Sequence, residues 1–321
     1  MQTDISAVTQ AADSVRNEMA KVVVGQREVI DQMLAALLCE GHVLLEGVPG
    51  IAKTLMVRAL SLAVKADYNR VQFTPDLMPS DVIGTNVFDP SSGAFKLRKG
   101  PVFTGLLLAD EINRTPPKTQ AALLEAMQER RVTIDGENHT LDAVFTVFAT
   151  QNPIEYEGTY PLPEAQLDRF MFKTIVGYPA YETEIEMLSR CNSGFRSVNI
   201  EQAGIEPVID VEQISQLRKI VSEVNLEQSV MDYIAKLVRK TRENRNLVLG
   251  ASPRASICLL IGSKAVAAMN GRSYVIPDDI KQIAAPVLRH RLILRPEAEI
   301  EGLTPDRVIE STVSEIEVPR I

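Results

Sequence analysis

Apolar residues are arranged in two different ways along the chain, and the change between them divides the sequence into two parts. Before about residue 178, three short runs are dense in apolar residues: His42 to Leu45, Gly105 to Ala109 and Val144 to Ala149. Such runs are typical of strands that are buried on both faces of a parallel sheet. Beyond Tyr178, apolar residues instead recur every three or four positions, as they do from Ile214 to Val224. This period predicts helices.

The fold class follows from this change of period. We expect an α/β domain with a parallel sheet over residues 1–178 and an all-helical domain over residues 179–321. A length of 321 residues is sufficient for two domains that each bury a core of their own.

Two helices have signals of their own. The segment from Ile5 to about Lys21 has apolar residues at intervals of three and four, as an amphipathic helix does. Pro277, Asp278 and Asp279 suit the first turn of a helix, because proline fits a position without an N–H partner and acids favour the positive end. Pro286 is expected to kink or end this second helix.

Two hairpins are predicted within the first domain. Asn86 to Arg98 is expected to turn at Ser91-Ser92-Gly93. In Arg131 to Leu141, the pair Asp135-Gly136 tolerates the positive φ of a tight turn and lies between residues of alternating polarity. Most such hairpins are plain structural ribbons, and this reading stays open for both.

The composition is that of a globular protein with an acidic balance. Hydrophobic residues make up 45% of the chain and the formal net charge is −8, which argues against a broad nucleic-acid-binding surface. No apolar run is long enough to cross a bilayer and the first residues lack the layout of a secretory signal, so we expect a cytoplasmic protein. Cys39, Cys191 and Cys258 form no CxxC pair and are expected to be small buried residues.

A loop with two glycines follows the first predicted strand. It reads Gly47-Val48-Pro49-Gly50-Ile51-Ala52-Lys53-Thr54 and leads into a helix-compatible run that begins with Leu55. A loop of this kind directs backbone N–H groups at phosphate oxygens, and the helix amino terminus adds partial positive charge. Lys53 is expected to reach the β and γ phosphates, and Thr54 to give its hydroxyl to Mg²⁺. The alternative is a purely structural strand–loop–helix connection.

Ala52 departs from the GxxxxGK[ST] pattern, which has glycine before the lysine. A methyl group costs little there if φ is helical, whereas a positive φ strains alanine. Because Ala52 lies beside the predicted helix start, we expect a helical φ.

The second predicted strand ends in two carboxylates, Asp110 and Glu111. At the carboxyl end of a parallel strand they lie in the crevice where ligands bind, facing the phosphate loop if the two strands are neighbours. Asp110 is then expected to hold Mg²⁺ through water, and Glu111 to orient the attacking water. An ordinary exposed acidic turn is the alternative.

Three further polar residues are candidates for catalysis. Asn152 follows the third predicted strand, where it could bond the γ-phosphate or the attacking water or simply form a turn before Pro153. Arg169 has apolar neighbours that suggest a fixed position, from which it could serve a neighbouring subunit. Arg254 follows Ser252 and Pro253 and should project from a helix start, where it could touch the γ-phosphate. A surface ion pair is the alternative for either arginine.

These segments, taken in order, resemble the MoxR-type AAA+ ATPases. The resemblance rests on GVPGIAKT, LLLADEINR, FATQNP, LPEAQLDRF and GASPRA, and on QFTPDLMPSDVIGT, which resembles the segment that follows the family's second strand. It covers about Val23 to Leu294. It implies a P-loop αβα core with a helical lid, and assembly into rings, commonly hexamers, that hold nucleotide where subunits meet.

The resemblance also implies roles for particular residues. The segment Gly47 to Leu55 and Asp110 are then expected to bind ATP or ADP, with Mg²⁺ at Thr54 and Asp110. Val24, Gly25 and Gln26 resemble the stretch that lines the adenine pocket. Arg169 is similar to the arginine finger that acts on the adjacent subunit, and Arg254 is similar to the second sensor, which closes the lid on ATP. The hairpins resemble the helix-2 insert and the hairpin before the first sensor.

Family members act as chaperone-like ATPases on client proteins, often with partners that contain a von Willebrand factor A domain, in maturing or inserting metal cofactors. A magnesium-chelatase-like subunit is the nearest alternative. A DNA-directed motor is another, because Lys96, Arg98 and Lys99 put positive charge on one hairpin, although the acidic balance of the chain disfavours it. A nucleotide-gated scaffold that does not hydrolyse ATP is disfavoured by the Asp110–Glu111 pair.

Overall fold

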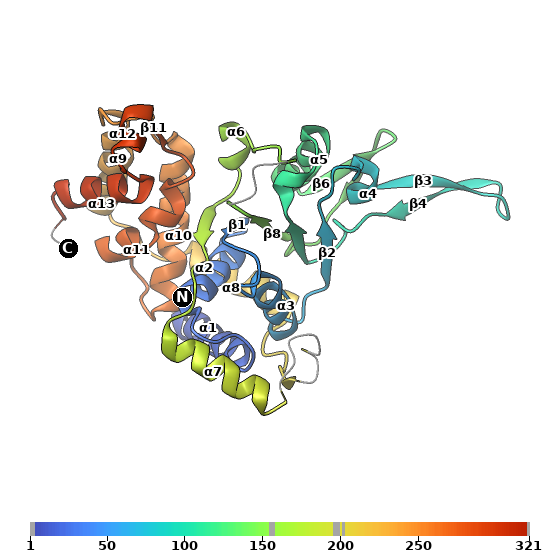
Figure 1. The fold of residues 1–321 in the computed structure, drawn as a ribbon. Helices are drawn as coiled ribbons and strands as arrows, with labels where there is room; N and C mark the ends of the chain where they lie inside the picture. The colour runs from blue at the N-terminus through green and yellow to red at the C-terminus, as the bar shows by residue number, and fades with distance from the viewer. Residues whose placement is uncertain (1–3, 154–157, 195–199, 201–202, 320–321) are drawn as a thin grey trace.

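The first domain is built on a parallel sheet of five strands, seen edge-on at the centre of Figure 1. The computed structural model describes residues 4–153, 158–194, 200 and 203–319. In spatial order the strands are β2 (Tyr68–Gln72), β5 (Leu106–Asp110), β8 (Thr146–Gln151), β1 (Val43–Glu46) and β9 (Phe172–Ile175). The three apolar runs of the sequence are β1, β5 and β8, so the predicted parallel sheet is confirmed.

The two faces of the sheet bury alternate residues of each strand, as the two-residue period of a strand requires. Leu44 and Leu107 point into one apolar core, while Val43 and Leu106 point into the other. Helix α5 and a hairpin cover the first face, and α1, α2 and α3 cover the second. The domain is therefore the αβα sandwich expected from the resemblance.

The helix α1 (Ile5–Ala20) coincides with the predicted amphipathic helix. The helices that follow it, up to residue 194, are α2 (Arg27–Leu38), α3 (Lys53–Ala63), α4 (Pro79–Ile83), the 3₁₀ turn η1 (Ile112–Arg114), α5 (Pro117–Glu129), α6 (Glu164–Leu167) and α7 (Tyr181–Asn192). None of the helices in the described residues is both long and apolar enough to cross a membrane.

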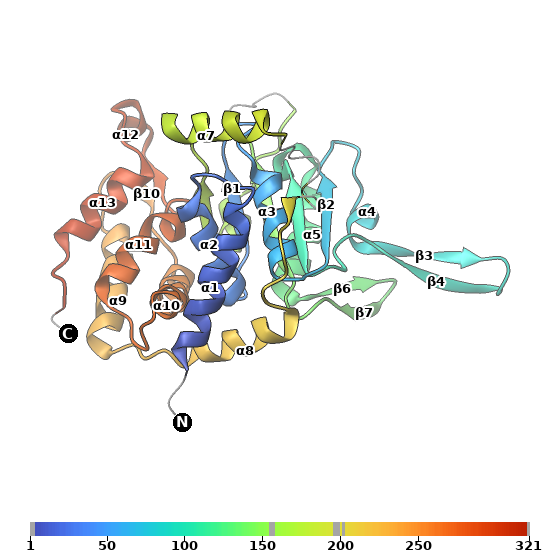
Figure 2. The same cartoon turned by 90° about the horizontal axis from the view of Figure 1, so that it is seen from below.

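Both predicted hairpins are present. One pairs β6 (Arg131–Ile134) with β7 (Glu137–Thr140), and Asp135 and Gly136 between them have the positive φ expected of the turn. The other pairs β3 (Gly84–Asp89) with β4 (Ala94–Lys99). Figures 1 and 2 both show this second ribbon projecting far from the body of the molecule.

The second part of the chain is mainly helical and packs beside one edge of the sheet (Figure 2). Its elements are α8 (Val211–Ser222), α9 (Gln228–Arg242), β10 (Leu247–Leu249), α10 (Pro253–Met269), α11 (Pro277–Leu288), β11 (Ile293–Leu294), α12 (Pro296–Ile300) and α13 (Pro305–Glu315). We call the part from α9 to α13 the lid. It is not all-helical as predicted, because β10 and β11 form a short antiparallel ribbon.

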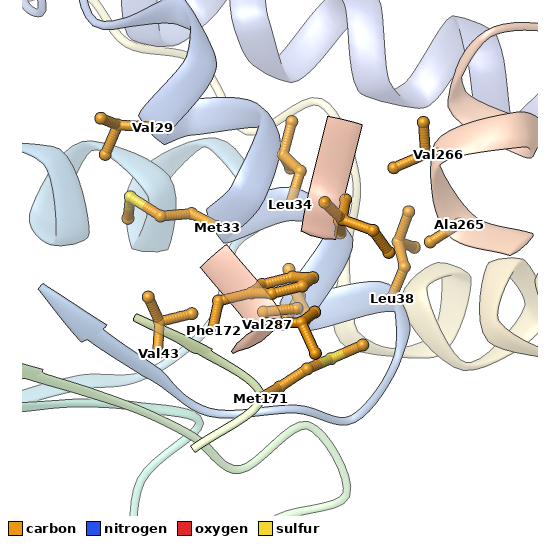
Figure 3. Packing of buried hydrophobic residues seen from close by; sticks show 14 of the residues in the cluster. Val29, Met33, Leu34, Leu38, Val43, Met171, Phe172, Ala265, Val266 and Val287 are labelled. Carbon is orange, nitrogen blue, oxygen red and sulfur yellow. The ribbon is translucent and has the colours of Figure 1, made fainter. Parts of the chain in front are cut away.

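The lid is packed closely onto the edge strand β9. Figure 3 shows Phe172 of this strand, and Met171 directly before it, lying among Val287 of α11 and apolar residues of α2 and α10. Gly262 of α10 allows the close approach, because a Cβ there would lie 2.8 Å from the Ile283 side chain and 3.3 Å from the ring of Phe172. The core that covers one face of the sheet therefore continues into the lid.

The expectations for Pro286 and the cysteines are met only in part. Pro286 lies inside α11, which continues to Leu288, so this proline does not itself end the helix, and the alternative that it kinks α11 stays a prediction. Cys191 is exposed rather than buried, whereas Cys39 and Cys258 are partly buried. Burial raises the pKa of the Cys39 and Cys258 thiols, so these two stay protonated and behave as the expected apolar side chains.

Candidate functional site

The loop between β1 and α3 has the geometry of a phosphate-binding loop. Gly47 begins it where the chain runs very close to β9: a Cβ would lie 2.5 Å from the carbonyl oxygen of Val176. Gly50 has a φ of +85° with open space around it, a conformation that glycine adopts without strain. Lys53 and Thr54 then form the first turn of α3.

Ala52 has the opposite conformation to the one predicted. Its φ is +63° and its ψ is +20°, in the left-handed region. The expectation of a helical φ was wrong, because α3 begins only at Lys53 and the residue before it must reverse the chain. Left-handed backbone costs a residue with a Cβ about 1 kcal/mol or more. The glycine that is usual at this position adopts the left-handed conformation without that cost, whereas Ala52 is strained by it.

The first turn of α3 presents donors with no partner inside the helix. The backbone N–H groups of Thr54 and Leu55 have no carbonyl four residues back within the helix, and Ala52 provides no side-chain cap. The Lys53 ammonium donates to the Gly47 carbonyl at 2.5 Å, which folds the lysine back over the loop. The loop therefore concentrates positive charge and N–H groups at one point, which suits a phosphate chain.

Asp110 and Glu111 lie at the carboxyl ends of the same sheet, but their strand is not the direct neighbour of β1. Strand β8 lies between β5 and β1, and Thr150 of β8 connects the two carboxylate residues. Its hydroxyl donates to Asp110 Oδ1 at 2.6 Å and accepts from the backbone N–H of Glu111 at 2.8 Å. Glu111 has a φ of +56°, so the chain turns sharply directly after the strand and directs this carboxylate away from the sheet.

Each carboxylate is paired with an arginine. Arg70 of β2 donates to Asp110 Oδ2 from Nη2 at 2.7 Å and from Nε at 3.1 Å. Arg114 lies 3.2 Å from Glu111 Oε2, which also accepts from the Gln72 amide at 2.6 Å. The arginines offset the repulsion between two adjacent carboxylates. They also hold both acidic groups in defined orientations.

One cavity of about 960 Å³ joins the loop to the carboxylates. The predicted site residues that line it are Val24, Pro49, Gly50, Ile51, Ala52, Lys53, Thr54, Leu55, Asp110, Glu111 and Asn152. Gly25, Gly47 and Val48 belong to the same segments but do not line it. The structure thus brings residues of the loop, the acidic pair and Asn152 to one cavity.

Apolar residues from two further segments also line the cavity. They are Val22, Val23 and Val24, and, on α7, Met187, Leu188 and Cys191, which lie on the same helix as the lining residues Glu184 and Arg190. A flat aromatic base fits against such apolar side chains. Cavities with an apolar wall and a few convergent polar groups are typical ligand sites.

Arg169 and Arg254 do not line this cavity. Arg169 instead borders a smaller hollow of about 240 Å³ beside α5, together with Glu125 and Glu129. Arg254 is exposed in the first turn of α10. Ser252, two residues before Arg254, donates to Asp168, the residue before Arg169, at 3.2 Å. Both therefore lie outside the chain's own site.

Sequence reasoning missed several residues of the site. Arg70 lies on a strand with no motif, and Gln72 is the first residue of the segment QFTPDLMPSDVIGT, so only the strand order reveals that they face Asp110 and Glu111. Thr150 was passed over in favour of Asn152, although it directly follows the predicted strand Val144 to Ala149. The α7 wall had no sequence signal, because its apolar residues resemble the buried face of any helix.

Two family models match the chain. A model described as the ATPase family associated with various cellular activities (AAA) matches residues 42–172, and a model of an AAA lid domain matches residues 239–312. The first covers the loop, the acidic pair and Arg169; the second covers Arg254.

Individual relatives align over most of the chain. "Uncharacterized protein YeaC" of Bacillus subtilis is 49% identical over 299 residues, which are 93% of this chain and 92% of that protein. "Chaperone MoxR1" of Mycobacterium tuberculosis is 41% identical over 313 residues, which are 95% of this chain and 81% of that protein. A crystal structure from Cytophaga hutchinsonii, assigned provisionally as an ATPase, superposes with a TM-score of 0.90 at 42% identity and covers 99% of this chain and 97% of that one.

Proposed function

Since this chain belongs to the MoxR family of AAA ATPases, we propose that it hydrolyses Mg·ATP within a ring of identical subunits and uses the energy to remodel or mature partner proteins. ATPase activity itself follows from membership of the family. The observation that carries the rest is the single cavity shared by the α3 amino terminus and the Asp110–Glu111 pair. The roles of individual residues, the ring and the partners belong to the proposal.

The cavity suits ATP from end to end. The N–H groups at the start of α3 and the Lys53 ammonium are donors for the β and γ phosphates. The apolar wall made by Val24 and α7 suits adenine. Because the chain has no NKxD segment, a guanine base has no such partner here.

The donors present also fit magnesium. Thr54 and Asp110 line the cavity and offer the oxygen ligands that Mg²⁺ prefers. When bound, the ion would neutralise charge on the phosphates. Arg70 must leave Asp110 Oδ2 for that oxygen to serve, and the half-exposed Arg70 side chain is free to swing into the solvent.

Glu111 is the group that we assign to the attacking water. Its carboxylate lies at the turn after β5, and Gln72 and Arg114 fix its direction. A carboxylate held in this way can orient and polarise a water molecule. Asn152 lines the same cavity and supplies an amide for the water or the γ-phosphate.

Subunit contact completes the site. In this proposal Arg169 serves the nucleotide of the adjacent subunit as an arginine finger. The structure offers no support for the expectation that Arg254 reaches the nucleotide of its own chain, because Arg254 does not line the cavity. We therefore place both arginines at the interface, where the nucleotide of one subunit meets the arginine face of the next.

For the work of the ring, we propose chaperone-like action in the cytoplasm on a client protein, for example in metal cofactor insertion, with a partner that contains a von Willebrand factor A domain. The similarity to a protein named as a chaperone supports this. A magnesium-chelatase subunit homologue is only 24% identical over 75% of this chain, so the chelatase alternative has weaker support.

The experiment combines assembly, turnover and capture. Sedimentation with and without Mg·ATP should show a nucleotide-dependent ring, and phosphate release should be lost in Lys53→Ala. Affinity purification from cell extract should then recover a client with Glu111→Gln in ATP but not with Lys53→Ala. A chain that stays monomeric in ATP yet turns over at a normal rate would overturn the ring.

A further inference from the structure

Arg291 is a buried arginine that no part of the ATP site uses. Its side chain is only 2% exposed and lies directly after α11, at the point where the lid meets the sheet. Burying a guanidinium is costly unless its charge is paired and its donors are satisfied. The hydrogen-bond acceptors of the Arg291 guanidinium therefore show which part of the chain this side chain fixes in place.

All five N–H donors of this guanidinium have partners. Nε donates to Asp168 Oδ1 at 2.6 Å, and Nη2 donates to the carbonyls of Asp168 at 3.1 Å and Phe170 at 2.8 Å. Nη1 donates to the carbonyl of Met171 at 3.3 Å and to that of Val287. Four of the five bonds thus go to the short segment between α6 and β9.

The same segment is held by other lid residues. The His290 ring bonds the Phe170 carbonyl at 3.1 Å. Burial lowers the pKa of His290 well below its usual value, so the ring is neutral. Ser252 of the lid donates to Asp168 at 3.2 Å. The Phe170 ring is itself fully buried in the core.

Arg169 lies between these held residues, and its own backbone N–H donates to the Gln166 carbonyl at 3.2 Å. Its two neighbours, Asp168 and Phe170, are fixed on either side, so its Cα has a defined position and direction. Its own side chain is partly exposed and borders the hollow beside α5. The lid therefore determines where this arginine points.

We infer that Arg291 is a positioning residue for ATP hydrolysis: it fastens the Arg169 segment to the lid, so that the lid and the arginine finger move as one body. The inference rests on the proposed role of Arg169 in the neighbouring subunit's site. Arg291 touches neither nucleotide nor water, and its effect is felt one subunit away. When the lid of one subunit moves, Arg169 of that subunit then moves towards or away from the nucleotide of the next subunit.

Arg291→Lys is the sharpest test. Lysine keeps the positive charge but has three donors at a single point, so it cannot satisfy Asp168 and the carbonyls of Phe170 and Met171 together. A misplacement of about 1 Å can cost up to about a hundredfold in rate. We expect kcat for ATP to fall about ten- to a hundredfold, with ATP affinity within about twofold of wild type.

Mixed rings separate positioning from simple loss of structure. Subunits with Lys53→Ala have a disabled site but an intact finger, so they should restore turnover in the sites of Arg291→Lys subunits when the two forms are co-assembled. The double variant Lys53→Ala/Arg169→Ala should restore nothing. Arg169→Ala subunits, co-assembled with Lys53→Ala subunits in the same way, show how much turnover is restored when only the finger itself has been removed.

Arg218→Lys is the matched control for burial. Arg218 of α8 is also a buried arginine, and it donates to the carbonyls of Leu37 and Ala143, far from Arg169. Its replacement should lower the melting temperature without the fall in kcat. If Arg291→Lys does not fold, Asp168→Asn removes the charge partner while leaving the carbonyl contacts, and it should show a smaller fall that Lys53→Ala subunits restore.

The outcomes are distinct. If Arg169→Ala loses activity and is restored in mixed rings, while the folded Arg291→Lys or Asp168→Asn keeps wild-type kcat or is not restored, the inference is overturned. If Arg169→Ala itself keeps wild-type turnover, the finger assignment in the proposed function has failed, and the role of Arg291 falls with it.

Discussion

Arg70 holds the Asp110 carboxylate through two hydrogen bonds to one oxygen, at 2.7 Å and 3.1 Å. That carboxylate is our candidate ligand of magnesium, so the guanidinium and the metal ion compete for the same charge. We predict that Arg70→Met lowers the magnesium concentration needed for half-maximal turnover by several-fold. A magnesium titration of phosphate release at saturating ATP measures this.

Arg131→Met is the control for the loss of one positive charge, because Arg131 is half exposed and pairs with Glu129 away from the cavity. Its magnesium dependence should match wild type. If Arg70→Met needs as much magnesium as wild type, the two cations do not compete at Asp110.

Glu111→Gln should separate binding from hydrolysis. The amide keeps the size of the side chain but cannot accept a proton or polarise water as a carboxylate does. We expect turnover to fall by about a hundredfold or more, with nucleotide affinity retained. Single-turnover assays with labelled ATP would show the substrate remaining bound and intact; rapid phosphate release would remove Glu111 from its role.

Arg169→Ala should reduce turnover by about 10³- to 10⁵-fold, the contribution of an arginine finger in related phosphoryl transfer. Because Arg169 lies outside the cavity of its own chain, ATP affinity should change little. Equilibrium binding of a fluorescent ATP analogue and steady-state turnover, measured on one preparation, test both parts. A large loss of affinity would contradict action on a neighbouring subunit.

Ala52→Gly should not destabilise the protein. Glycine removes the strain of the left-handed conformation, worth about 1 kcal/mol or more, and costs about 0.5 to 1 kcal/mol in backbone entropy. We expect the free energy of unfolding in urea to stay the same or rise by up to about 1 kcal/mol. The same change at Ala121, exposed on α5, should lower it by about 1 kcal/mol. Equal losses at both positions would contradict the positive φ of Ala52.

His42 predicts a loss of stability in mild acid. Burial lowers its pKa to about 4. The Nδ1 atom accepts from the Val147 N–H at 2.9 Å, so the proton lies on Nε2, which faces the Met127 carbonyl. An unfolded histidine titrates near about 6.5. Between that pH and about pH 4, His42 is protonated in the unfolded chain but stays neutral in the folded chain.

The free energy of unfolding should therefore be highest above about pH 6.5 and fall towards pH 4, by up to about 3 kcal/mol for this group. His290 contributes in the same direction. Urea unfolding at intervals between pH 4 and 7 measures the slope. His42→Asn keeps an acceptor for Val147 and should flatten the slope; an unchanged slope would show that His42 is not its source.

The sequence was sufficient to predict elements whose signal is local. The apolar run before Asp110 and the Asp135-Gly136 turn each specify their own backbone, and both are present, as is a loop between strand and helix at Lys53. Positions that depend on partners distant in the chain were not predictable. Arg70 and Thr150 meet Asp110 only because the strand order is β2-β5-β8-β1, and no local pattern encodes that order.

Ala52 shows a different limit. The phosphate-loop pattern was recognised correctly, yet its conformation was mistaken, because proximity to a helix start was given more weight than the reason glycine is usual at that position. The identity of the usual residue already pointed to a positive φ. The contact of Ser252 with Asp168, by contrast, could not be predicted from residues 84 positions apart.

The arginines that follow α11 have an effect on solubility as well. Arg289 donates to the Lys173 carbonyl at 3.1 Å, and Arg291 donates to that of Met171, so one carbonyl of the edge strand β9 and the carbonyl directly before this strand are already occupied. An open edge strand is a template for pairing with other chains. A core cut free of its lid would expose both this edge and the apolar side chains above it, and would be prone to aggregate.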